Sequence, residues 1–137
     1  MIKFDQVNKR YPGSFDAIKN VSFEIEQGDL VFVTGASGAG KSTLLKLIAG
    51  LERPVGGEIS VNGRVVYSAE KKIFIPPNQR NFGMVFQSYA IWPHMNVFQN
   101  AAFPLEVRAN RPGEKEIRDK VMRVLAAVGL EELAGRD

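Results

Sequence analysis

Residues 35–42 read Gly35-Ala36-Ser37-Gly38-Ala39-Gly40-Lys41-Ser42 and fit the pattern G-x-x-x-x-G-K-[ST] of a phosphate-binding P-loop. The flanking residues also fit this motif. An apolar, β-branched run at 30–34 predicts a buried strand before the loop. After the loop, leucine and isoleucine recur at helical spacing over 44–48, and Gly50 is expected to end that helix. Strand, glycine loop and helix are the context that a P-loop requires, which disfavours the alternative of a glycine-rich turn with an exposed lysine.

The composition of the loop suits a nucleoside triphosphate with Mg²⁺. Glycines let the backbone take positive φ and approach the phosphates, and the next helix points its N-terminus at the same place. Lys41 is expected to reach the β- and γ-phosphates, and the Ser42 hydroxyl to ligate Mg²⁺. The residues expected to contact the nucleotide here are Gly35, Ala36, Ser37, Gly38, Ala39, Gly40, Lys41, Ser42 and Thr43.

Composition excludes several other classes of function. The 137 residues are 45% hydrophobic and 24% charged, as in a soluble globular domain. The net charge of +3 is small and the charges are scattered, which does not favour a nucleic-acid partner. The absence of cysteine excludes disulfides and thiolate metal sites. No apolar run approaches the roughly 18 residues of a membrane-spanning helix, and no secretory signal is visible.

Antiparallel strand signals flank the P-loop on both sides. Alternation of apolar and polar residues predicts strands near the N-terminus, at 21–26 and at 58–61. Asn62-Gly63 predicts a type I′ hairpin with a returning strand at 65–67. The apolar run 82–86 predicts another buried strand. The chain is therefore not a simple alternation of strands and helices.

Two helices are expected in the last third of the chain. Asn96 is expected to cap a helix that begins at Val97 and is cut off by Pro104. Residues 114–128 carry apolar side chains at helical spacing, and Gly129 is expected to end that helix.

The order of these pieces resembles the nucleotide-binding subunit of ABC (ATP-binding cassette) transporters. Arg10-Tyr11-Pro12 looks like the A-loop of the family, whose aromatic ring stacks on adenine, and Phe86-Gln87-Ser88 looks like the Q-loop. The resemblance implies ATP and Mg²⁺ as cofactors, Tyr11 as the adenine contact, Lys41 and Gln87 as catalytic residues, and Ser42 and Gln87 as Mg²⁺ ligands. From the residues alone, the favoured interpretations are a Tyr11 packed at the edge of the core and a Gln87 in a solvated loop.

Residues 81–97 are similar to importer subunits of the ferric-iron, polyamine and maltose-like group. This similarity implies that the segment from Ser88 to Val97 receives transmembrane permease subunits, and exposed rings at Tyr89 and Trp92 would suit such an interface. The alternative is that both rings belong to the core. The single histidine, His94, fits a loop or an interface better than a metal site.

The resemblance implies an α/β fold: a truncated P-loop NTPase core with an antiparallel β subdomain and the start of a helical subdomain. Residues 1–87 are expected to form the nucleotide-binding core and residues 88–137 the beginning of the helical subdomain. The function implied is that of an ABC importer subunit, an ATPase that couples ATP binding and hydrolysis to transport. It would work with a second ATPase subunit, peripherally at the cytoplasmic face of the cell membrane.

Several motifs of the family are not found in this sequence: the LSGGQ-type signature, the Walker B strand, the D-loop and the switch histidine. We therefore expect an N-terminal portion of the subunit that binds nucleotide without turnover, with an unpaired edge beside the strand at 30–34. Two alternatives remain open. One is a small P-loop phosphotransferase that uses Arg108, Arg111 and Arg118 in a lid. The other is a non-catalytic nucleotide-binding or protein-binding module.

Overall fold

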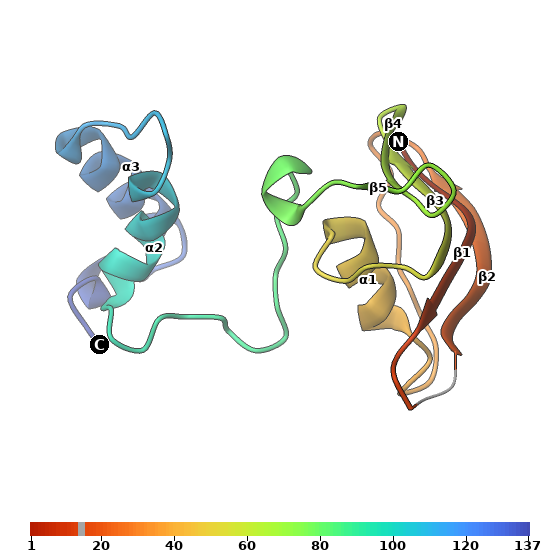
Figure 1. Cartoon of the computed structure of the whole chain (residues 1–137). Helices are drawn as coiled ribbons and strands as arrows, with labels where there is room; N and C mark the ends of the chain where they lie inside the picture. Colours follow the sequence, from red (N-terminus) through yellow and green to blue (C-terminus); the bar gives the residue numbers. More distant parts are fainter. Residues whose placement is uncertain (14–15) are drawn as a thin grey trace. The chain divides into compact units, whose positions relative to one another are not determined.

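The computed structural model describes residues 1–13 and 16–137 and divides into two units, Met1–Met84 and Val85–Asp137 (Figure 1). A functional division at residue 87 into a nucleotide-binding core and a helical subdomain stays a prediction.

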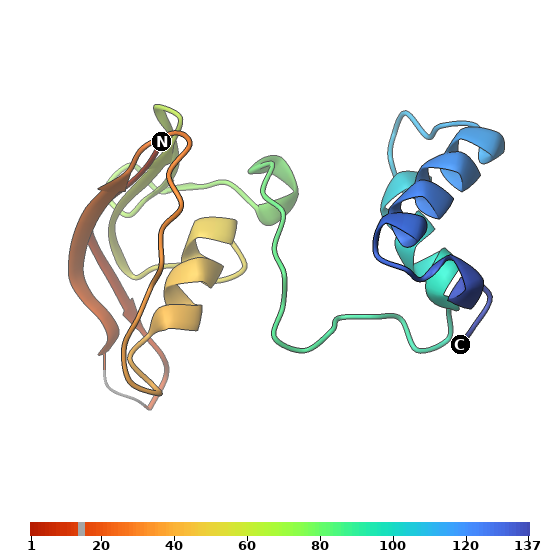
Figure 2. The ribbon, with the colours of Figure 1, turned by 180° about the vertical axis from the view of Figure 1, so that it is seen from behind.

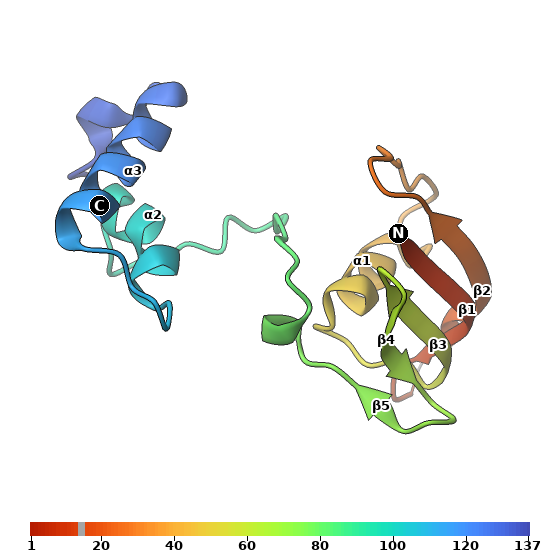
Figure 3. The same cartoon turned by 90° about the horizontal axis from the view of Figure 1, so that it is seen from above.

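The first unit is built on a five-stranded antiparallel sheet in the order β2-β1-β3-β4-β5 (Figure 3). Its strands are β1 (Ile2–Arg10), β2 (Asp16–Ile25), β3 (Gly56–Val61), β4 (Arg64–Ser68) and β5 (Ile73–Phe74). The predicted alternation is confirmed in β2, where Val21, Phe23 and Ile25 are half-buried between exposed polar neighbours. The turn between β3 and β4 has positive φ at Asn62 (49°) and Gly63 (77°), as a type I′ hairpin requires.

Helix α1 (Lys41–Ala49) covers one face of this sheet (Figures 1 and 2). Its Leu47 is fully buried in a core with Phe4, Val7 and Ile59 of the sheet. Gly50 ends the helix as predicted, with a φ of 78° and its N–H donating to the carbonyl of Leu47. Burial of this apolar stripe against the strands is what orients α1.

Arg80 joins the end of α1 to the sheet. It follows the 3₁₀ turn η1 (Pro77–Gln79) and is only 5% exposed. Its Nη1 donates to the carbonyls of Leu47 (2.8 Å) and Ile48 (3.0 Å), and its Nε donates to Ile75 (2.7 Å). Burial lowers the pKa of the Arg80 guanidinium, but the carbonyl end of a helix stabilises a cation.

A residue without a Cβ is required at position 50 partly because the Arg80 guanidinium lies so close to it. A Cβ at Gly50 would lie 2.5 Å from the Arg80 Nε, closer than carbon and nitrogen can approach. The sequence pattern gives no signal of this role of Arg80, because its partners are up to 33 residues away.

The two predicted buried strands at 30–34 and 82–86 are not strands in the structure. Leu30 is 82% exposed, Phe32 79% and Val85 98%. A buried parallel strand needs neighbours to satisfy its N–H and C=O groups. In the described part of the chain no strand pairs with either segment, so the two predictions are wrong for this structure.

The second unit contains α2 (Val97–Glu106), α3 (Glu114–Ala127) and the 3₁₀ turn η2 (Glu131–Leu133). The two helices share a core of Ala102, Ile117, Val121 and Leu125. The predicted cap is confirmed, since the Asn96 side chain accepts from the Gln99 N–H (2.8 Å) and the Gln99 side chain accepts from the Asn96 N–H (2.9 Å). Among the described residues, no helix has the length and apolarity needed to cross a membrane.

The predicted stop at Pro104 is wrong, because α2 continues through it to Glu106. Proline removes one N–H from the helix. Two contacts stabilise the helix beyond the proline. Leu105 packs against the core of the second unit, and the Val107 N–H donates to the Phe103 carbonyl (3.2 Å).

Replacing Arg80→Met should lower the free energy of unfolding by about 2–4 kcal/mol, because buried carbonyls of α1 lose their donor. Arg64→Met is the matched control: it removes an exposed arginine from β4 and should change stability by less than about 0.5 kcal/mol. Urea denaturation followed by circular dichroism measures both. Equal stability of the two variants would contradict the role given to Arg80.

Candidate functional site

The loop before α1 is shaped by glycines with positive φ, one of which, Gly40, lies against β2. Gly38 and Gly40 have φ of 80° and 87°, a region that side chains with a Cβ rarely adopt. At Gly40 the constraint is also steric, because a Cβ would lie 2.5 Å from the Ala17 carbonyl oxygen and 2.9 Å from Ile18 Cδ1. The backbone of β2 therefore positions the end of the loop and the start of the helix.

The N-terminus of α1 offers backbone donors to an anion. In the part of the chain that the structure describes, no side chain caps this helix at Gly40, and no acidic residue lies in its first turn. The first N–H groups of a helix have no partner within it, and the helix dipole places partial positive charge there. Ser42 lies exposed in the same turn. The arrangement suits a phosphate group.

The Lys41 side chain folds back over the loop. Its Nζ donates to the carbonyls of Gly35 (2.9 Å) and Ala36 (2.7 Å). An ammonium has three donors and these contacts use two of them, so it can add a bond to an anion without leaving the loop. The structure thus brings the loop, Lys41 and Ser42 together as the sequence pattern predicts; their contacts with a nucleotide stay a prediction.

Tyr11 follows the end of β1 and lies beside the first turn of α1. Its hydroxyl is 3.4 Å from the Thr43 Oγ1, and the Lys9 ammonium lies over its ring, 4.7 Å from the centroid. The ring is half-buried. Tyr11 is therefore close to the predicted phosphate contacts although 32 residues separate it from Thr43.

Gln87 and the segment 88–97 belong to the second unit. Gln87 is exposed, and its part in the site stays a prediction. Tyr89 is 91% exposed and Trp92 48%, so the alternative that both rings are core is wrong. Trp92 packs beside Phe103 of α2, with ring centroids 5.6 Å apart.

Asn100 holds the segment before α2 through its side chain, a role that the sequence pattern did not predict. Its side chain accepts from the Trp92 N–H (2.7 Å) and donates to the carbonyls of Trp92, Met95 and Asn96. One asparagine within a helix shows no signal of this role in the sequence.

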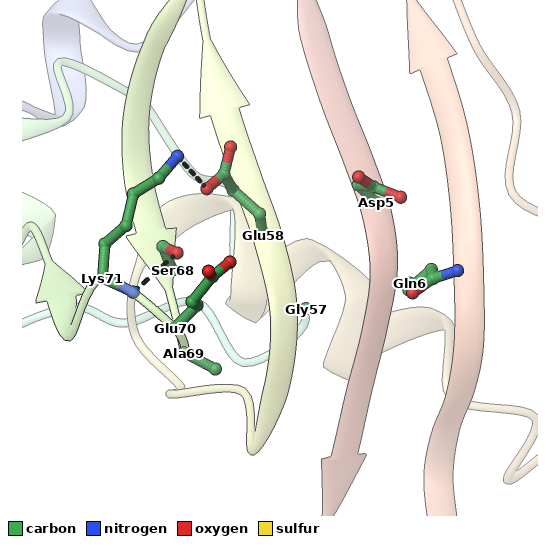
Figure 4. Close-up of a pocket in the computed structure, with 8 residues that line it drawn as sticks. All are labelled: Asp5, Gln6, Gly57, Glu58, Ser68, Ala69, Glu70 and Lys71. Atoms are coloured by element: carbon green, nitrogen blue, oxygen red, sulfur yellow. Dashed lines mark hydrogen bonds and ion pairs between the residues drawn. The ribbon is translucent and has the colours of Figure 1, made fainter.

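A pocket of about 430 Å³ opens on the sheet of the first unit (Figure 4). Its lining includes Glu58 and Lys71, which form an ion pair at 2.8 Å, and Ser68, whose Oγ accepts from the Lys71 N–H (3.2 Å). None of the predicted nucleotide contacts is among its described lining residues. Likewise, the described residues contain no group of three or more His, Cys, Asp or Glu side chains that could hold a metal ion.

The sequence model of the ABC transporter family matches residues 18–137. The chain belongs to the ABC transporter family. It is 44% identical over 124 residues to the trehalose/maltose import ATP-binding protein MalK of Thermococcus litoralis, covering 90% of this chain and 33% of that protein. It is 42% identical over 137 residues to the spermidine/putrescine import ATP-binding protein PotA of Legionella pneumophila, covering 100% of this chain and 35% of that protein. The chain spans about a third of the length of the curated relatives it matches.

Solved structures of ABC cassettes confirm the predicted fold class. A dimeric structure of the cassette MJ0796, described as a post-hydrolysis state bound to ADP and Pi, matches with a TM-score of 0.82 at 28% identity. A second dimeric structure of MJ0796 matches with a TM-score of 0.83 at 28% identity. Each match covers 98% of this chain and 60% of the solved chain.

Gly40→Ala should cost about 2–4 kcal/mol of unfolding free energy, because the new Cβ combines a left-handed φ with contact against the Ala17 oxygen. Gly38→Ala is the control: it has a similar φ but nothing within 4 Å, and should cost about 1 kcal/mol. Thermal and urea unfolding of both variants measure the difference. If Gly38→Ala were as destabilising as Gly40→Ala, the contact with β2 would not be the constraint.

Proposed function

We propose that this protein is the ATP-binding subunit of an ABC importer and that residues 1–137 provide its adenine and phosphate contacts. The observation that carries the proposal is the position of the Lys41 ammonium, which the carbonyls of Gly35 and Ala36 hold beside the uncapped N-terminus of α1. Membership of the family and the import proteins among its relatives support the same function.

The geometry of the loop supports the proposed phosphate contacts. Backbone N–H groups of the loop and of the first turn of α1 would bind the phosphate oxygens, and Lys41 would add a charge-assisted hydrogen bond. Because Lys41 is already held by two loop carbonyls, little side-chain freedom is lost on binding.

The candidate protein ligands suit Mg²⁺ only when the ion is bound together with the nucleotide. Mg²⁺ is commonly bound by one or two protein oxygens, by phosphate oxygens and by water. Ser42 and Gln87 are the proposed protein ligands, and their neutral oxygens suit an ion whose charge the triphosphate balances. When bound, Mg²⁺ would neutralise charge on the β- and γ-phosphates.

Tyr11 is the proposed adenine contact. A half-buried aromatic ring beside the start of α1 offers a flat face to a base, which gives affinity with little selectivity among bases. The Thr43 contact holds the ring near the phosphate loop, so base and phosphates of one nucleotide can be bound together.

ATP hydrolysis coupled to import is the proposed activity of the whole protein. The proposed partners are transmembrane permease subunits, which would bind the segment 88–97, and a second ATPase subunit. The 91% exposure of Tyr89 and the dimeric state of the MJ0796 structures support these partners. Such a subunit would lie peripherally at the cytoplasmic face of the membrane. The names of the relatives give different transported substrates, so no substrate is proposed for this importer.

Lys41→Ala should weaken ATP binding by at least about 10- to 100-fold, since a hydrogen bond to a charged group is lost. Isothermal titration calorimetry of the 137-residue chain measures this, with melting temperature as the check on folding. Lys46→Ala, in the last turn of the same helix, is the control and should bind ATP as the unmodified chain does. Unchanged affinity in Lys41→Ala would show that the loop does not bind phosphate.

Tyr11→Ala should weaken ATP binding about 10-fold, as expected for the loss of one base–aromatic stack, and should scarcely change the affinity for tripolyphosphate. Tyr11→Phe is the control, because it keeps the ring and removes only the hydroxyl beside Thr43. The same calorimetry compares the two ligands. An equal loss for ATP and tripolyphosphate would argue against stacking on adenine.

A further inference from the structure

Lys9 is a nearly buried lysine next to the proposed adenine contact. It lies in β1, two residues before Tyr11, and its ammonium contacts the Tyr11 ring. Only 10% of the Lys9 side chain is exposed. A lysine is rarely buried unless its ammonium is paired, so its partners show what holds it there.

The Lys9 ammonium has three contacts. It pairs with the Glu52 Oε2 at 2.9 Å, donates to the Arg53 carbonyl at 2.9 Å, and lies over the Tyr11 ring at 4.7 Å from the centroid. Glu52 and Arg53 lie in the connection that follows α1. The ammonium is therefore held by this connection and also contacts the ring.

The ion pair is maintained at neutral pH. The hydrogen bond from Lys9 is the main cause that holds the pKa of the Glu52 carboxyl below its usual value, with smaller contributions from the charge of Lys46 and from the Tyr11 hydroxyl, although partial burial opposes the shift. The Glu52 carboxylate therefore holds the Lys9 side chain in place.

We propose that Lys9 is a positioning residue for the nucleobase: it holds the Tyr11 ring so that adenine stacks on the face opposite the ammonium. The inference rests on the proposed stacking of adenine on Tyr11. A cation is attracted to the face of an aromatic ring and excludes a base from that face. The Lys9 ammonium lies over one face of the ring, and the Tyr11 hydroxyl contacts Thr43, so the base would stack on the opposite face.

The variant Lys9→Met tests the inference because it removes the charge and keeps the apolar stem. ATP binding to the 137-residue chain should weaken about 3- to 10-fold, while tripolyphosphate affinity stays unchanged. Lys9→Arg, which keeps the cation, should restore most of the ATP affinity. Lys3→Met is the matched control, since Lys3 also lies in β1 and pairs with a glutamate, Glu24, but has no contact with Tyr11.

A purely structural role for Lys9 gives a different result. In that case Lys9→Met would lower the melting temperature and would weaken the binding of ATP and of tripolyphosphate equally, which would overturn the inference. Unchanged binding of both ligands would also overturn it. If Lys9→Met does not fold, as judged by circular dichroism, Lys9→Gln replaces it, because a neutral amide can still donate to the Arg53 carbonyl. If the Lys9→Gln variant binds ATP as tightly as the unmodified chain, the inference is also overturned.

The Tyr11→Ala background separates this inference from the proposed function. Lys9→Met should cause no further loss of ATP affinity once the ring is gone. If Tyr11→Ala lowers ATP affinity selectively and Lys9→Met does not, the role of Lys9 is wrong and adenine stacking stands. If Tyr11→Ala has no selective effect, both proposals are wrong.

Discussion

The attachment of α1 to the antiparallel sheet is the constraint on which the candidate site depends. The helix is held at both ends by contacts that are distant in sequence. At its start, Gly40 lies against the backbone of β2, where a Cβ would be 2.5 Å from the Ala17 oxygen. At its end, the Arg80 guanidinium binds the carbonyls of Leu47 and Ile48 and also that of Ile75. Because both ends are fixed, the first turn of α1 presents its N–H groups at one place, which is what an anion site requires.

The two halves of the proposed nucleotide site come from different elements. The phosphate half is local, since Lys41 binds carbonyls of the loop that immediately precedes it. The base half is not local, since Tyr11 follows β1 and reaches the site only because β1 lies in the sheet that α1 covers. Lys9 links the two, because its partners Glu52 and Arg53 follow α1 while its ammonium lies over the Tyr11 ring. A buried ion pair contributes little net stability, so its use here is better understood as orientation of a ring.

Sequence patterns predicted the elements whose stabilisation is local. The Asn62-Gly63 turn and the Asn96 cap are set by backbone and side-chain contacts within four residues, and both are present. The strands at 30–34 and 82–86 were predicted wrongly. An apolar run indicates that a segment could be buried in a sheet, but it does not show whether neighbouring strands are present to pair with it. Exposed residues such as Phe32 and Val85 show the consequence, since they are apolar surface without a strand beside them in the described part of the chain.

The kind of ligand is predicted from the sequence alone, because a P-loop of eight consecutive residues would contact phosphate mainly through its own backbone and the adjoining helix. The family follows from the order of short motifs along the chain, and the family model that matches residues 18–137 shows it. Only the tertiary structure decides where Tyr11 lies, why Lys9 is buried and what Arg80 binds, because each depends on contacts across 32 to 44 residues. Such contacts are set by packing of the sheet against α1, and packing between distant segments leaves no periodic pattern in either segment.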